Sequence, residues 1–172
     1  MVNNGMILQI RRSFMKEIKV EIPNYKTVRI EHVVLDYNGT LAEDGLLKDT
    51  ARELLQELSL LCKVHVITAD TFGSVHKQVE SFDLEVKVLT SEDHTQEKAD
   101  YVEHLGAMHC AAVGNGNNDV GMIKKAVVGI ALLGDEGCST ATMMQSDLVC
   151  KSIEDALRLF VKSKRLIATL RK

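Results

Sequence analysis

The sequence predicts an α/β protein built on a doubly wound, open parallel sheet, and two observations lead to this fold class. Short apolar runs rich in β-branched residues recur along the chain, as expected for strands that are covered on both faces. Helical stretches separate these runs, and strands that alternate with helices pair in parallel. The length of 172 residues fits one domain, because domains average roughly 150 residues.

A β-hairpin is expected first, because apolar and polar residues alternate over residues 17–22 and 26–30 around a turn at 23–25. Residues 1–15 are assigned to a tail and residues 16–172 to the folded core. Five strands of the parallel sheet should follow, at residues 33–35, 64–67, 86–89, 111–113 and 127–130.

Apolar spacing predicts the helices between these strands. From Leu47 to Leu61, apolar residues recur at intervals of three and four, which indicates one buried stripe along a helix of about 15 residues. Ala99, Val102 and Leu105 follow the same spacing further along the chain. The basic stretch at residues 162–172 is typical of the solvated side of a last helix.

Composition and charge exclude several classes of partner. With 21 Lys and Arg against 24 Asp and Glu, the net charge of -3 offers no broad attraction for nucleic acid or for an anionic membrane. Membrane spans need roughly 18 or more consecutive apolar residues, and the sequence has no such run. The four cysteines are scattered without a C-x-x-C pair, which favours buried thiols in a reducing cytoplasm.

Candidate functional residues follow the strands, because ligands in open α/β sheets bind beyond the carboxyl ends of the strands. Asp36 ends the first parallel strand, Thr68 ends the second, Lys98 opens a helix, and a Gly-rich acidic loop at residues 114–119 follows the fourth strand. A carboxylate can attack phosphorus, and an ammonium group, a metal and a hydroxyl can hold the phosphoryl oxygens. Magnesium suits the oxygen ligands available here.

The order of these segments resembles the haloacid dehalogenase (HAD) superfamily. Its motifs are a D-x-D-G-T-like strand end, a Thr or Ser, a Lys and an acidic loop. Within the superfamily, residues 97–100, 113–119 and 123–126 are most similar to the phosphorylation domain of P-type ATPases and its small soluble relatives. The likeness runs from about residue 17 to the C-terminus, and it implies a Rossmann-like HAD core.

This resemblance implies roles for individual catalytic residues. Asp36 would be the nucleophile, Thr68 the phosphate-binding hydroxyl and Lys98 the charge clamp, and Asn38 lies at the position of a second catalytic residue. A small phosphorylated substrate would contact Thr68, Ala69, Lys98 and Gly39.

The resemblance also implies a Mg²⁺ site. Its ligands would be Asp36, the main-chain carbonyl of Asn38, and two residues of the acidic loop, Asn115 and Asp119. Asn115 replaces an acid of the family pattern, so its oxygen can bind magnesium but brings no charge. Weaker metal binding is expected.

Asn38 is the second departure from the family pattern, because most phosphatases of the superfamily have an Asp there that protonates the leaving group and then activates water. An amide cannot exchange a proton in this way. The leading hypothesis is a magnesium-dependent phosphohydrolase acting through an aspartyl phosphate on Asp36. The alternative is a phosphate-binding or phosphorylated regulatory protein of the same fold with little or no turnover.

The spacing of the motifs leaves no room for a cap domain. Asp36 and Thr68 are separated by one helix, one strand and loops, and the interval from Thr68 to Lys98 is similar. An uncapped site needs walls from elsewhere, so we expect a homo-oligomer.

Overall fold

The computed structural model describes residues 16–70 and 73–172, so the predicted tail at residues 1–15 lies outside the described residues. Its centre is a six-stranded sheet in the order β10-β9-β8-β3-β6-β7, in which every neighbouring pair is parallel. The predicted fold class is therefore confirmed. The strands are β3 (His32–Asp36), β6 (Lys63–Thr68), β7 (Leu84–Val88), β8 (Cys110–Gly114), β9 (Val128–Leu132) and β10 (Leu148–Cys150).

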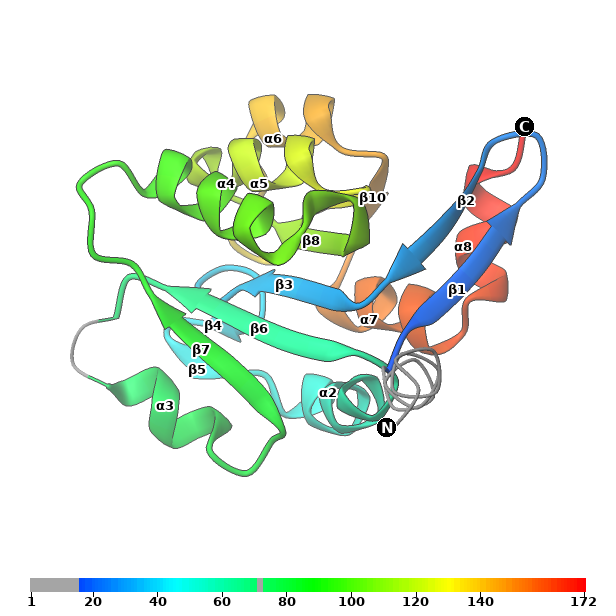
Figure 1. The fold of residues 1–172 in the computed structure, drawn as a ribbon. Coiled ribbons are helices and arrows are strands. Elements are labelled where there is room, and N and C mark those ends of the chain that lie inside the picture. The colour runs from blue at the N-terminus through cyan, green and yellow to red at the C-terminus, as the bar shows by residue number, and fades with distance from the viewer. Residues whose placement is uncertain (1–15, 71–72) are drawn as a thin grey trace, which may run out of the picture.

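Helices cover both faces of this sheet (Figure 1). One face carries α4 (His94–Leu105), α5 (Val120–Lys125) and α6 (Thr140–Gln145), and the other carries α2 (Asp49–Leu61), α3 (Ser74–Val79) and α7 (Ile153–Val161). Successive side chains of a strand point to opposite faces. Val33 and Leu35 accordingly join the core cluster on one side, and Val34 joins the cluster on the other.

The first crossover contains one feature that the apolar spacing did not predict. Leu47 belongs to β5 (Leu46–Leu47), which pairs with β4 (Ala42–Glu43) in a short antiparallel hairpin, so the helix begins at Asp49. Leu47 is nevertheless buried like the helical leucines, and apolar spacing alone could not separate it from them. The buried stripe also ends early, because Leu61 is 38% exposed.

The predicted N-terminal hairpin is present as β1 (Ile18–Ile22) and β2 (Lys26–Ile30), paired antiparallel. It forms a sheet of its own, and it packs beside α8 (Lys164–Leu170) near the C-terminus (Figure 1). Leu166 is buried while Lys164 and Arg165 are exposed, so the basic stretch does form the solvated side of a last helix. Two short 3₁₀ turns, η1 (Ala107–His109) and η2 (Asn117–Asp119), flank β8.

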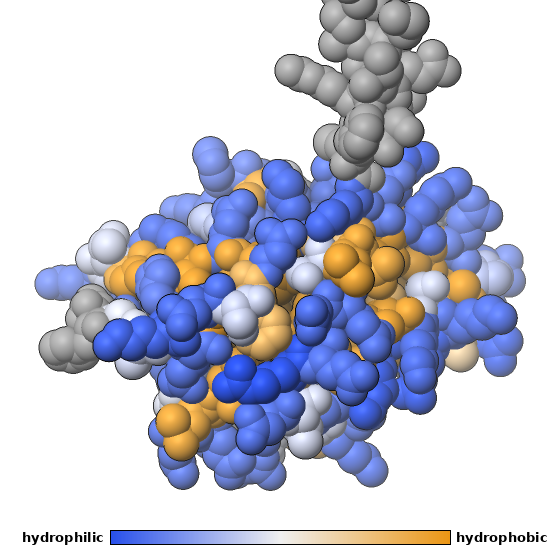
Figure 2. All heavy atoms as spheres, turned by 90° about the horizontal axis from the view of Figure 1, so that it is seen from below, coloured by the Kyte–Doolittle hydropathy of each residue, from blue (hydrophilic) through white to orange (hydrophobic). Residues whose placement is uncertain are grey.

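The surface carries apolar side chains in separate patches. Seen from below, these patches alternate with hydrophilic side chains (Figure 2). Leu46 and Leu60, on the crossover from β3 to β6, are 68% and 69% exposed. Within the described residues, no helix has the length and apolar character needed to cross a membrane.

Candidate active site

The carboxyl ends of the central strands bring the predicted site residues to one edge of the sheet. Asp36 is the last residue of β3, and its neighbours β6 and β8 end at Thr68 and Gly114. Lys98 reaches the same edge from the second turn of α4, which begins at His94. Parallel strands align their carboxyl ends, so this convergence follows from the topology.

Lys98 forms the centre of the site. Its Nζ donates hydrogen bonds to Asp36 Oδ1 and to Asp119 Oδ1, both at 2.6 Å, and its side chain is 1% exposed. Asp119 is fully buried and Asp36 nearly so. One ammonium group thus faces two carboxylates, leaving a net negative charge that suits an added cation.

The pKa values of this group follow from burial and mutual charge. Burial and the charge of Asp119 raise the pKa of Asp36 to about 7, although Lys98 acts in the opposite direction. Burial alone would lower the pKa of Lys98, but the two carboxylates outweigh it and raise that pKa. Lys98 therefore stays protonated as a fixed positive charge.

Asp119 also shapes the loop that carries it. Its Oδ2 accepts hydrogen bonds from the main-chain N–H groups of Asn115, at 3.0 Å, and Gly116, at 2.8 Å. Gly114 permits this closure, since a Cβ atom there would lie 2.5 Å from Asp119 Cγ. The Asp119 oxygens retain lone pairs beyond these contacts, and its role as a metal ligand stays a prediction.

A tight turn follows Asp36. Gly39 adopts a φ of 76°, and its N–H donates to the Ala42 carbonyl at 2.9 Å. This N–H is therefore occupied, and a substrate contact from Gly39 stays a prediction. Asn38 lies two residues after Asp36 and is exposed. Thr40 Oγ1 donates to Asn115 Oδ1 at 3.3 Å, which connects the turn to the acidic loop.

Thr68 and Ala69 lie on the other side of Asp36. The Thr68 side chain is buried, and its Oγ1 accepts the N–H of Asp70 at 3.0 Å, while Ala69 is exposed. Asp70 Oδ2 in turn accepts the N–H of Val75 at 2.9 Å, which satisfies a free donor at the start of α3. Asp70 thus acts as a helix cap, as its position after the strand suggests.

The oxygen atoms around Asp36 fit a hard divalent cation. Asp36 offers a carboxylate, Asn115 an amide oxygen and Asn38 a main-chain carbonyl, and such oxygens are the ligands that Mg²⁺ takes. Across residues 16–70 and 73–172, no three His, Cys, Asp or Glu side chains form a metal-binding group. A cation at this edge would therefore depend on amide and main-chain oxygens as well as carboxylates.

The loop after β9, residues 133–139, is part of the site although the sequence motifs did not include it. Asn115 Nδ2 donates to the Gly137 carbonyl at 3.0 Å, and the Ser139 N–H donates to the Asn115 carbonyl at 2.8 Å. Asp44 on the β4–β5 turn donates its N–H to Glu136 Oε1 at 3.3 Å. The rule that directs attention to the carboxyl end of each strand applies equally to β9 and could have found this loop.

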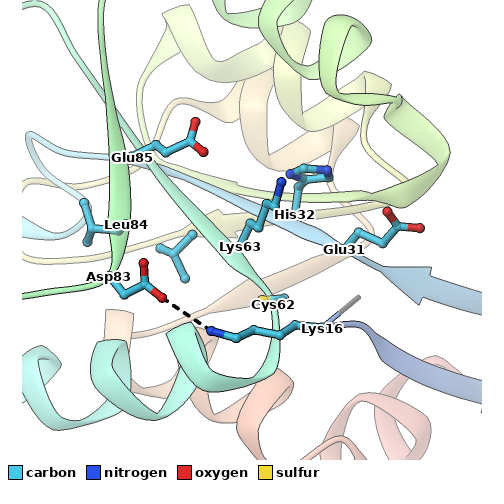
Figure 3. Close-up of a pocket in the computed structure, with 9 residues that line it drawn as sticks. Lys16, Glu31, His32, Cys62, Lys63, Asp83, Leu84 and Glu85 are labelled. Atoms are coloured by element: carbon cyan, nitrogen blue, oxygen red, sulfur yellow. Dashed lines mark hydrogen bonds and ion pairs between the residues drawn. The ribbon is translucent and has the colours of Figure 1, made fainter. Parts of the chain in front are cut away.

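A separate cavity of about 390 Å³ lies at the opposite end of the sheet, at the amino ends of β3, β6 and β7 (Figure 3). His32 and Lys63 line it, and Lys16 and Asp83 pair across its rim at 3.3 Å. It contains none of the predicted site residues. Cys62 also lines it and is buried, as the sequence predicts for its thiols, and burial raises the pKa of that thiol to about 12.

Comparisons with known proteins bear on the fold of this chain. No family model matches the sequence. An uncharacterized protein of Methanocaldococcus jannaschii is 50% identical over 60 residues, which cover 35% of this chain and 64% of that relative. This chain therefore spans less than two thirds of the length of that relative.

Solved structures are similar over most of the chain. The 3-deoxy-D-manno-octulosonate 8-phosphate phosphatase of Moraxella catarrhalis, solved with magnesium and phosphate ions, is 20% identical with a TM-score of 0.66, covering 83% of this chain and 94% of that one. The cobalt-bound phosphatase of Haemophilus influenzae is 15% identical with a TM-score of 0.62, covering 82% and 89%. A zinc-transporting P-type ATPase is 26% identical with a TM-score of 0.52, covering 72% of this chain and 20% of that one.

The chain thus has the α/β core fold shared by HAD-superfamily phosphatases and the phosphorylation domain of P-type ATPases. The crossover from β3 to β6, which the structure describes completely, holds only the β4–β5 hairpin and α2 and no cap domain. The solved structures similar to this chain include phosphatases that contain magnesium or cobalt.

Proposed function

We propose that this protein is a magnesium-dependent phosphohydrolase that acts through an aspartyl phosphate on Asp36. The observation that carries the proposal is the buried Lys98 ammonium group, held at 2.6 Å from both Asp36 and Asp119 at the carboxyl edge of the sheet. Burying three charges is costly. A buried ammonium group at this position would stabilise the negative charge of a bound phosphoryl group, which accounts for its burial beside the nucleophile.

Each residue has a defined task in this proposal. The ionised Asp36 carboxylate attacks phosphorus, and the bond from phosphorus to the departing oxygen breaks. Lys98 offsets charge on the phosphoryl oxygens, while the Thr68 hydroxyl and main-chain groups near Ala69 and Gly39 orient them. Water then attacks the aspartyl phosphate and releases inorganic phosphate and the Asp36 carboxylate.

The proposed cation site lies beside Asp36. Asp36, the Asn38 carbonyl, Asn115 and Asp119 would hold Mg²⁺, and the bound ion would supply positive charge that favours ionised Asp36 and offsets phosphoryl charge. The neighbouring phosphatases solved with magnesium or cobalt support this choice.

Asn38 determines which substrates are favoured. A positioned general acid contributes about 10² to 10⁴ in rate, and the Asn38 amide cannot act as one. Aryl phosphates, acyl phosphates and phosphoanhydrides leave as stabilised anions and need little protonation. We therefore propose that these small phosphorylated compounds are hydrolysed faster than sugar or alkyl phosphates, with slow release of the aspartyl phosphate.

The second candidate is a protein of the same fold that binds phosphate or is phosphorylated on Asp36 without useful turnover. Asn38 favours it, because its amide cannot exchange a proton with water as the Asp of the family pattern does. A cytoplasmic location is compatible with both functions and remains part of the proposal.

A phosphatase screen distinguishes the two candidates. Aryl, acyl, sugar and nucleotide phosphates are tested with and without Mg²⁺, and Asp36→Asn is the matched control because it keeps the size of the side chain. Hydrolysis that needs both Mg²⁺ and Asp36 supports the phosphohydrolase. Stoichiometric phosphorylation with no multiple turnover supports the regulatory protein, and turnover at the wild-type rate in Asp36→Asn contradicts both.

A further inference from the structure

The proposed cation site lacks a negative charge where Asn115 replaces an acid. Its amide is also fully oriented, because Nδ2 donates to the Gly137 carbonyl and Oδ1 accepts from Thr40. Asn115 can therefore offer an oxygen but no charge. The affinity of the site for a divalent cation therefore depends on the carboxylates near this side chain.

Glu136 brings a carboxylate to this place. A Cβ atom on Gly39 would lie 3.0 Å from Glu136 Oε2, and also 2.6 Å from Asn115 Nδ2 and 3.0 Å from Asn115 Oδ1. The Glu136 carboxylate and the Asn115 amide therefore lie over the same face of the turn after Asp36, within a few ångströms of each other. The main-chain carbonyl of Asn38, a proposed ligand, immediately precedes Gly39.

One hydrogen bond holds the Glu136 side chain, and two other features hold the loop that carries it. Its Oε1 accepts the Asp44 N–H, which leaves Oε2 toward Gly39. The loop lies close to the turn at a second point, since a Cβ atom on Gly134 would lie 3.2 Å from the Gly39 carbonyl oxygen. The Gly137 carbonyl then ties the loop to Asn115.

Asp135, the neighbouring acid, has a different role. Its carboxylate forms an ion pair with Lys48, which also lies 3.4 Å from Glu43, so Asp135 is held toward the β4–β5 side of the loop. Glu136 takes part in none of the ion pairs formed among residues 16–70 and 73–172. Of the two adjacent acids, Glu136 is therefore the one that forms no ion pair within that part of the chain and that lies close to Asn115.

We propose that Glu136 is an additional carboxylate of the cation site, which supplies the negative charge that Asn115 lacks. This inference rests on the proposed function, because it concerns the same divalent cation. Carboxylates that surround metal ligands typically change metal affinity by about 10- to 100-fold. Neutralising Glu136 should therefore weaken cation binding even when no substrate is present.

Mn²⁺ binding to the full chain tests this directly, with free Mn²⁺ measured by electron paramagnetic resonance. Glu136→Gln should raise the Kd for Mn²⁺ about tenfold or more. Asp135→Asn, the matched control, removes the same charge one residue away and should leave the Kd within about twofold, because Asp135 is already paired with Lys48. Unchanged melting temperatures would exclude misfolding as the cause.

A second variant places the missing charge on position 115 itself. Asn115→Asp should tighten Mn²⁺ binding, and in that background Glu136→Gln should cost less than in the wild type, because the two carboxylates serve one cation. Equal losses in both backgrounds, equal effects of Glu136→Gln and Asp135→Asn, or no effect of Glu136→Gln would overturn the inference.

The outcomes separate this inference from the proposed function. If Glu136→Gln weakens Mn²⁺ binding but no phosphate compound is hydrolysed, the cation site stands and the phosphohydrolase fails. If Asp36-dependent hydrolysis occurs while Glu136→Gln binds Mn²⁺ like the wild type, only the role of Glu136 fails. A wild-type chain that binds no Mn²⁺ contradicts both.

Discussion

We predict that His65 makes the stability of this fold depend on pH. Its side chain is 1% exposed within the α4 side of the sheet. Nε2 lies 2.9 Å from His32 Nδ1, and Nδ1 lies 2.9 Å from the Tyr101 hydroxyl and 3.5 Å from Glu85. Burial, followed by the charges of His32 and Lys63, lowers the pKa of His65 from 6.5 to about 4.

The sign and size of the effect follow from this pKa. Between pH 6.5 and pH 4 the unfolded chain binds a proton that the folded chain does not. The stabilisation is therefore complete above pH 6.5 and is lost as the pH falls toward 4. A pKa difference of this size corresponds to about 3 kcal/mol in the free energy of unfolding.

Urea unfolding at a series of pH values measures this contribution. The wild type should lose about 3 kcal/mol more than His65→Gln between neutral pH and pH 4. His104→Gln, a substitution of an exposed histidine, should retain the wild-type dependence. Parallel stability profiles for the wild type and His65→Gln would refute the assignment of the buried proton to His65.

Three further predictions concern the site and the assembly. In Asn38→Asp, a restored acid should raise the rate on a sugar phosphate at least about tenfold more than on p-nitrophenyl phosphate, and equal gains in steady-state assays would show that another group supplies the proton. Gly114→Ala should destabilise the fold by about 1 to 3 kcal/mol, because the new Cβ atom meets Asp119; an unchanged urea midpoint would contradict this. The uncapped site and exposed apolar side chains such as Leu46 predict self-association. A mass of 19.1 kDa, that of the monomer, measured by light scattering would contradict this prediction.

Most of the fold could be predicted from the sequence because buried parallel strands carry a strong apolar signal. Residues 33–35 and 111–113 are fully buried, and this signal alone predicts both strands. The edge strand β10 was missed, because it has only three residues and Val149 within it is 47% exposed. Short, half-exposed edge strands lack the apolar run on which the prediction depends.

The candidate site was predictable where the topology determines it. Lys98 contacts Asp36, and Thr68 ends the neighbouring strand, because the strand ends and a crossover helix lie at the same edge of the sheet. Glu136 was not predicted, because its approach to Gly39 depends on the path of an irregular loop. That path includes positive φ angles at two glycines, 52° at Gly134 and 85° at Gly137, and no periodic pattern encodes it.

The central claim is that Asp36 accepts a phosphoryl group, and trapping that group tests it most directly. The protein is mixed with Mg²⁺ and an acyl phosphate, quenched in acid, digested and examined by mass spectrometry. We predict one phosphoryl group per chain, located on Asp36, removed by hydroxylamine and absent from Asp36→Asn. Phosphate hydrolysis with no modified Asp36, or a phosphoryl group on a different residue, would contradict the account.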